Sequence, residues 1–250
     1  MKRRCIHRAS LAAIAGLALA WPALGQAAEA IGAPDMADFV LRNLEAPYLT
    51  DAERARLRVF HGVWTASDLE DPALRAQAAL MLGVYDDPVF DDPAVSPLDR
   101  AEALGARGFL EEVLAIADPA DGARAARIRV ASLMGLGRFE QALQEADAAV
   151  EALQRADLRD AERATELVRI LMLRADLRGE PAKHYTQMLS MLATVHQEID
   201  RSYWPALLVE AELLVKKNAA GDGQKAAIDV LARNPMCAEA WHLLGWWAVQ

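Results

Sequence analysis

Two Asp-Asp-Pro copies, at 86–88 and 91–93, bring four carboxylates together in a short stretch that could bind a metal ion. Hard cations bind carboxylate oxygens, so a calcium loop is one interpretation. However, the stretch lacks the alternating Asp or Asn residues and the glycine of an EF-hand loop, and no glutamate follows at the required distance. The sequence therefore favours a proline-punctuated loop in which aspartates cap the turns, and we expect no bound metal.

The histidines and the cysteine form no catalytic pattern. Beyond residue 30 the chain has His61, His184, His196 and His242, and none belongs to the HExxH pair that binds zinc from one helix. Cys237 follows Pro-Met and precedes an apolar helix, so we expect it to be buried as a small apolar residue. Because no G-x-S-x-G, Walker or dinucleotide-binding motif is present, we expect the chain to be neither an enzyme nor a cofactor-binding protein.

Residues 1–30 have the pattern of a secretory signal peptide. Lys2, Arg3, Arg4 and Arg8 precede an apolar run over 11–24. This run is shorter than the roughly 20 residues of a membrane-spanning helix, although an uncleaved anchor is the alternative. We therefore expect an exported protein, periplasmic or secreted, with no stable membrane insertion after cleavage. Only one cysteine then remains, which excludes an internal disulfide.

The charge balance argues against nucleic acid as a partner. The chain has 27 basic and 36 acidic residues and a formal net charge of -9, and loss of the leader makes it more acidic. Nucleic acids and anionic membranes bind basic surfaces. The densest basic groups are Lys216-Lys217 and the arginines of 124–129, and we expect both to be solvated helix faces.

Apolar spacing predicts paired helices through most of the chain. The clearest pair covers 123–153, where apolar residues recur at helical spacing on both sides of Gly135 and Gly137. Thr50 and Glu53 have the spacing of a capping box at the start of an earlier helix. The other predicted helices cover 36–44, 50–64, 73–83, 98–117 with a glycine break, 159–178, 182–198, 204–218, 224–233 and 238–250. No β-rich segment competes with them.

The predicted helices divide the chain into three parts. A signal peptide (1–30) precedes an N-terminal helical region with the Asp/Pro-rich loop (31–95), and helical repeats (96–250) follow, the last of them incomplete. Gly221-Asp222-Gly223 is expected to separate the two helices of one pair. Methionines at helical spacing over 188–191 are expected in the core, with a binding groove as the alternative.

The C-terminal residues resemble the tetratricopeptide repeat (TPR) family, whose unit is a helix pair of roughly 34 residues. Pro235 is similar to the proline that closes one repeat, and Trp241, Leu244 and Gly245 have the W-x2-L-G spacing that opens the next. The resemblance implies an all-α, right-handed solenoid of antiparallel helix pairs. Gly245 would allow two helices to approach within about 8–10 Å.

The central pair carries the second part of this resemblance. Gly137 is similar to the turn glycine, and Phe139 to the aromatic residue that follows it. Ala142 and Ala149 match the small residues at the helix contact. We expect these residues, with those of the C-terminal motif, to pack successive repeats together.

These patterns favour an exported TPR-like scaffold that mediates protein–protein interaction in the cell envelope. Repeat surfaces offer a long curved interface without a catalytic group, although the sequence does not identify the protein partner. One alternative is the non-catalytic N-terminal repeat region of a longer secreted or periplasmic enzyme such as a hydrolase, because the sequence stops at Gln250 inside a repeat. Another is a self-assembling repeat protein, a homo-oligomer that associates through the apolar C-terminal helix, which includes Trp246 and Trp247.

Overall fold

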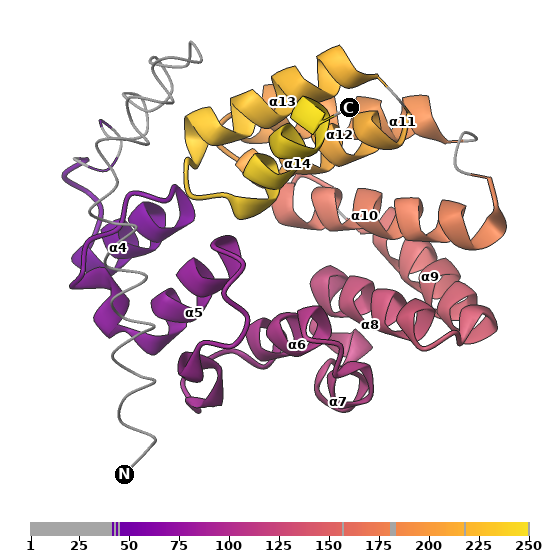
Figure 1. Ribbon diagram of the computed structural model, residues 1–250, viewed down its shortest axis with the longest axis horizontal. Coiled ribbons are helices and arrows are strands. Elements are labelled where there is room, and N and C mark those ends of the chain that lie inside the picture. The colour runs from indigo at the N-terminus through magenta and orange to yellow at the C-terminus, as the bar shows by residue number, and fades with distance from the viewer. Residues whose placement is uncertain are drawn as a thin grey trace.

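The computed structural model describes residues 42, 44, 46–156, 158–180, 184–217 and 219–249. Over these residues the chain forms eleven α-helices and no β-strand (Figure 1), which confirms the predicted all-α class. The predicted leader and most of the predicted helix over 36–44 lie outside the described residues. Within the described part, no helix is both long enough and apolar enough to cross a membrane.

The first described helices form an N-terminal unit that begins with the predicted capping box. The Thr50 hydroxyl accepts a hydrogen bond from the Glu53 amide at 3.2 Å, and the Glu53 carboxylate accepts one from the Thr50 amide at 2.7 Å. The sequence predicts a helix as far as residue 64, but Gly62 has a φ of +69° and turns the chain earlier. The unit contains α4 (Asp51–Phe60), the 3-10 turn η1 (Asp68–Glu70), α5 (Pro72–Met81) and the 3-10 turn η2 (Pro88–Asp91).

The rest of the chain consists of helices joined by short connections. They are α6 (Pro97–Ala106), α7 (Leu110–Ile116), α8 (Ala123–Gly135), α9 (Phe139–Gln154), α10 (Ala161–Arg178), α11 (Tyr185–Thr194), α12 (Trp204–Lys216), α13 (Ala220–Arg233) and α14 (Ala238–Val249). Gly108 (φ +85°) and Gly137 (φ +74°) make the turns before α7 and α9, at two of the predicted glycine breaks. A 3-10 turn, η3 (Pro119–Asp121), precedes α8, and a π-helical turn, η4 (Val195–Ile199), extends α11.

One predicted break is wrong. Gly221 and Gly223 were expected to separate two helices, but both lie in the first turn of α13, which begins at Ala220. The first amides of a helix have no intrahelical acceptor, and an acidic residue such as Asp222 is favourable there, so this turn tolerates glycine better than a helix interior does.

The helices alternate between two layers. The even-numbered helices α6, α8, α10, α12 and α14 pack successively on one another. Each odd-numbered helix, from α7 to α13, packs on both even-numbered helices that flank it in sequence, and these helices lie toward the periphery in Figure 1. The even-numbered layer therefore carries one face that the odd-numbered helices do not cover.

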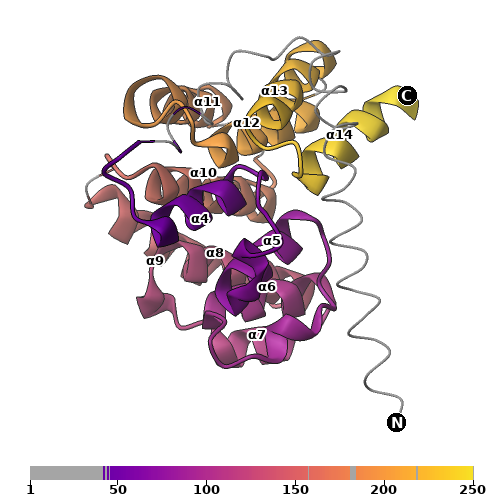
Figure 2. The same ribbon diagram turned by 90° about the vertical axis from the view of Figure 1, so that its left-hand side faces the viewer.

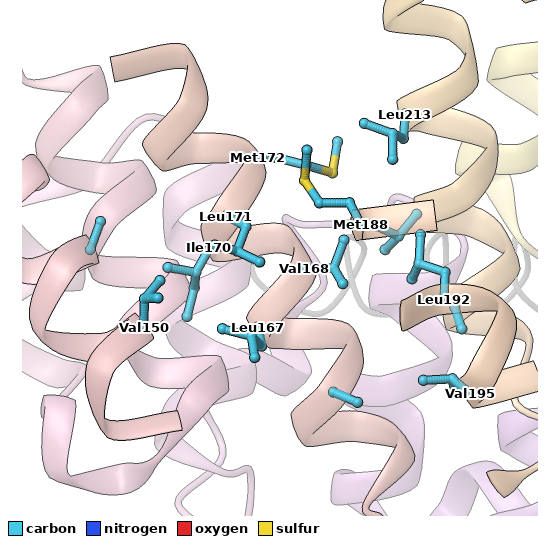
Figure 3. Close-up of a cluster of buried hydrophobic side chains, with 14 of the residues drawn as sticks. Val150, Leu167, Val168, Ile170, Leu171, Met172, Met188, Leu192, Val195 and Leu213 are labelled. Atoms are coloured by element: carbon cyan, nitrogen blue, oxygen red, sulfur yellow. The ribbon is translucent and has the colours of Figure 1, made fainter. Parts of the chain in front are cut away.

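The largest apolar cluster surrounds α10. In Figure 3, Ile170 points toward Val150 of α9, while other α10 side chains lie toward Met188 and Leu192 of α11. Met188 is 1% exposed and Leu192 is 0% exposed, so this stretch of methionine and leucine packs in the core rather than lining a groove. Burial of these side chains fixes α10 between its neighbours on both sides.

The N-terminal unit meets the C-terminal helices. The N-terminal unit lies beside α12–α14 in both views (Figures 1 and 2). The Phe60 carbonyl accepts hydrogen bonds from Trp204 Nε1 at 2.7 Å and from Asn234 Nδ2 at 3.3 Å. We call this contact, made by Phe60, His61 and Gly62 with Trp204, Asn234 and their neighbours, the closure junction. It makes the array of helices closed rather than open-ended.

Candidate functional site

Charged side chains from the even-numbered helices converge on one surface. Arg169 of α10 interacts electrostatically with Glu212 of α12 and Glu239 of α14, as well as with Arg127 of α8. We call this set the charged face. It comprises Asp99 and Glu102 (α6), Arg124 and Arg127 (α8), Glu162, Glu166 and Arg169 (α10), Glu212 (α12) and Glu239 (α14).

Helical spacing positions the first part of the charged face. Asp99 and Glu102 are three residues apart, so they lie on the same side of α6, and Arg124 and Arg127 have the same relation on α8. Arg124 donates a hydrogen bond to Asp99 Oδ1 at 2.7 Å and another to Glu102. Arg127 also donates to Glu102, so α6 and α8 are joined by two adjacent arginines.

The row of ion pairs continues onto α10. Arg127 Nε donates to Glu166 Oε2 at 2.5 Å, while Arg169 Nη1 lies 3.9 Å from Glu166 Oε1, too far for a hydrogen bond. The Nε atom of Arg169 is buried and has no hydrogen-bond partner among the described residues. Opposite charges therefore alternate across three helices, and the pairing becomes weaker toward Arg169.

Electrostatics keep Glu102 and Arg127 ionised. Burial alone would raise the pKa of Glu102, but the charges of Arg127 and Arg124 outweigh it and lower that pKa to about 2. For Arg127, burial would lower the pKa, but Glu166 and Glu102 outweigh it and raise that pKa. These charges are therefore permanent at any physiological pH.

Three carboxylates of the charged face lack such a partner. Glu162, Glu212 and Glu239 form no ion pair or side-chain hydrogen bond with any other described residue. Burial raises the pKa of Glu212 and that of Glu162, because each carboxylate loses water without gaining an adjacent cation that compensates fully. This part of the face is acidic and would be stabilised by a cation.

The residues of the predicted central motif lie away from the charged face, between α8 and α9. Gly137 makes the turn, and Ala142 is 0% exposed. Ala149 is partly buried against the cluster around α10. Phe139, however, is 59% exposed, so the expectation that this aromatic packs the repeat is wrong. It lies at the start of α9, where the turn directs it into solvent.

The residues of the predicted C-terminal motif also lie apart from the charged face. The Pro235 carbonyl accepts a hydrogen bond from Trp241 Nε1 at 2.8 Å, and Trp241 and Leu244 pack on the cluster formed by α12 and α13. A side chain at Gly245 would meet nothing within 4 Å among the described residues, and the close helix approach at this glycine stays a prediction. The two motif sets belong to different helix pairs and are not brought together.

The Asp-Asp-Pro stretch has a structural role in this fold. Asp87 accepts a hydrogen bond from the Val89 amide at 2.9 Å, as expected of a turn cap, and it is paired with Arg75 Nη2 at 2.9 Å. A shallow cavity of about 430 Å³ borders this loop, between Arg75, Pro72 and Asp92. Among the described residues, no group of His, Cys, Asp or Glu has the arrangement of a metal site.

The four histidines lie at separate places. His61 is 4% exposed at the closure junction, and His184 precedes α11. His196 Nε2 lies 3.0 Å from Glu210 Oε2, and His242 is exposed on α14. Cys237 is buried at 2% exposure, which confirms the prediction for it, and burial raises the pKa of its thiol to about 12.

The charged face is the part of the site that the sequence prediction missed. The arginines of 124–129 were expected to be solvated, yet Arg124 and Arg127 are paired as described, and Arg129 donates to Glu145 at 2.8 Å and 2.9 Å. One signal for this was present in the sequence. Asp99 and Glu102 are three residues apart on one predicted helix, and Arg124 and Arg127 are three residues apart on the next.

No protein-family model, curated protein or solved structure matches the chain. The function therefore has to be inferred from the geometry and charge of the described residues.

Proposed function

We propose that the chain is an exported, TPR-like scaffold that binds another protein in the cell envelope through the charged face. The two alternating helix layers support this, since antiparallel pairs stacked in a right-handed solenoid present one helix of each pair on a common face. The signal-peptide pattern of residues 1–30 supports export. A binding role needs only a shaped and charged surface.

The observation that carries the proposal is the set of carboxylates that form no ion pair or side-chain hydrogen bond with another described residue. Glu162, Glu212 and Glu239 come from α10, α12 and α14, which pack successively. Helices in contact lie about 8–10 Å apart, so these carboxylates span roughly 20 Å. An extended peptide covers that distance with about six residues. The partner segment we propose is therefore an extended one that carries two or three lysine or arginine side chains.

A pair of matched double variants tests this function. Glu212→Gln/Glu239→Gln removes two negative charges from the charged face, and Glu112→Gln/Glu140→Gln removes two from exposed positions at the starts of α7 and α9. Each protein would be used to capture partners from a cell-envelope extract with cross-linking and quantitative mass spectrometry. We expect a partner that the wild type and the α7/α9 variant recover and that the charged-face variant loses, cross-linked through a basic segment. Recovery of the same partner by all three proteins, or of none by any, would contradict the proposal.

Self-assembly is a second candidate, favoured by one observation. Trp246 is 43% exposed on α14, whose sequence is mostly apolar. Sedimentation equilibrium over a wide concentration range tests this candidate, with Trp246→Ser as the variant expected to lower any dimer fraction. A monomer mass at every concentration would exclude it.

A further inference from the structure

The closure junction joins segments that are far apart in sequence through a few polar contacts. Trp204 Nε1 and Asn234 Nδ2 donate to the same Phe60 carbonyl across sequence separations of 144 and 174 residues. Asn234 is 0% exposed, and its Oδ1 atom accepts a hydrogen bond from the Met236 amide at 3.0 Å. One buried asparagine thus joins α4, the turn after α13 and the start of the last helix.

Apolar contacts complete the closure junction. Met236 shares one buried cluster with Val59 and Trp64 of the N-terminal unit, and Phe60 packs against a second cluster that contains Trp204 and Cys237. Cys237 belongs to the cluster on which Phe60 packs and is 2% exposed, so we expect its thiol to become more accessible when the contact opens.

His61 is the titratable group in the middle of the junction. Its Nδ1 atom lies 3.2 Å from the carbonyl oxygen of Arg233, which is the last residue of α13. Its ring packs edge-on against the Phe60 ring, with 5.0 Å between the two ring centroids. The charged groups that act on it are the Arg233 guanidinium and the Asp200 carboxylate. Burial lowers the pKa of His61 and Arg233 lowers it further, whereas the Arg233 carbonyl and Asp200 raise it, and burial prevails.

We propose that the closure junction is a pH-sensitive latch: neutral His61 holds the N-terminal unit against α12–α14, and protonation of His61 releases it. Release would open only the closure junction. The N-terminal unit would stay attached to α6, because a separate apolar cluster joins the two. The latch goes beyond partner binding, since it would control whether the helical array is closed or open.

The size of the effect follows from proton linkage. A group whose pKa is lowered in the closed form favours closure fully above its ordinary value, 6.5 for histidine, and this contribution is lost as the pH falls below that value. If the released His61 has the ordinary value, the ratio of open to closed protein rises by at most about tenfold between pH about 7.5 and pH about 5.5, and it reaches this limit when His61 stays neutral in the closed form throughout.

Cys237 provides the measurement. In the full chain carrying Cys5→Ser, Cys237 is the only thiol. Its reaction rate with a disulfide reagent that remains active at acidic pH, such as 4,4′-dithiodipyridine, reports opening after normalisation to free cysteine at the same pH. We expect the rate to rise with falling pH by up to about tenfold over this range, with the far-UV circular dichroism unchanged.

Two variants and one control separate the latch from other causes. His61→Gln keeps a donor but cannot be protonated, so its rate should not depend on pH, whereas His242→Gln, on the exposed side of α14, should behave as the wild type does. Trp204→Phe removes one of the two donors to Phe60 and should raise the rate already at neutral pH. A wild-type rate that does not change with pH, the same change in His61→Gln, or thiol exposure that coincides with loss of helix would each overturn the proposal.

Discussion

Replacing Gly62 with alanine tests the geometry of the closure junction most directly. A Cβ atom at this position would lie well inside the contact distance to Asn234 Oδ1 and 3.1 Å from Met236 Cβ. Gly137→Ala is the matched control, because Gly137 has nearly the same φ (+74° against +69°) but a Cβ there meets nothing within 4 Å. The difference between the two variants therefore isolates the contact with Asn234 from the cost of a left-handed backbone.

Two free-energy costs act on these variants: the left-handed backbone in both, and the contact with Asn234 in Gly62→Ala only. A non-glycine residue in the left-handed region loses about 1–2 kcal/mol, offset by roughly 0.4–1 kcal/mol from the stiffer unfolded chain. Gly137→Ala should therefore lower the free energy of unfolding by about 1 kcal/mol. Gly62→Ala should also displace Asn234 from its hydrogen bonds with Phe60 and Met236, at about 1 kcal/mol each. We expect Gly62→Ala to lower the free energy of unfolding by about 3 kcal/mol in total.

Urea unfolding of the two variants at neutral pH, followed by circular dichroism, measures both values. The rate of Cys237 modification should increase in Gly62→Ala and stay unchanged in Gly137→Ala, because only the first variant disturbs the closure junction. Equal destabilisation by the two alanines would refute the close contact at Gly62.

Three further outcomes are expected. Arg127 and Arg124 lower the pKa of Glu102 to about 2 from its ordinary value of 4.5, so its charge stabilises the fold above about pH 4.5, and this contribution is lost as the pH falls toward 2. Urea titrations across that range should show a shallower pH dependence for Glu102→Gln than for wild type. Leu192→Ala, at a fully buried position beside α10, should lower the free energy of unfolding by about 2–5 kcal/mol, and a value near zero would mean that α11 does not pack there. Ser96→Ala removes the hydroxyl that accepts from the Asp99 amide at 3.1 Å and should cost about 1 kcal/mol in the same assay, with an unchanged midpoint arguing against the cap.

The helices could be predicted because the signals that define them are local. Asp71 and Ser96 cap the helices that follow them, as their positions before Pro72 and Pro97 indicate. The glycine at 179 ends α10 in a left-handed conformation. Each of these signals involves residues within one or two turns, so no knowledge of the fold was needed.

The charged face and the closure junction could not be predicted in the same way. The ion pair between Asp99 and Arg124 joins residues 25 apart, and the bond from Asn234 to Phe60 joins residues 174 apart. Such partners become visible only after the helix layers are placed. Phe139 is an aromatic residue at helical spacing that proved to be exposed. Its position in core or solvent could not be assigned before the direction of the turn that precedes α9 was known.

Contact between the first and the last described helices has a consequence for how the chain acquires its structure. A linear array can form by adding one helix pair after another, each next to its predecessor, and needs few long-range contacts. Here Val59 and Trp64 obtain part of their cover from Met236, which is synthesised much later. A chain that emerges N-terminus first would therefore present these apolar side chains to its surroundings until α13 and α14 arrive. The closure junction can form only after the residues around Met236 have been made, so the speed of synthesis and the protection of this early segment should govern the yield of folded protein.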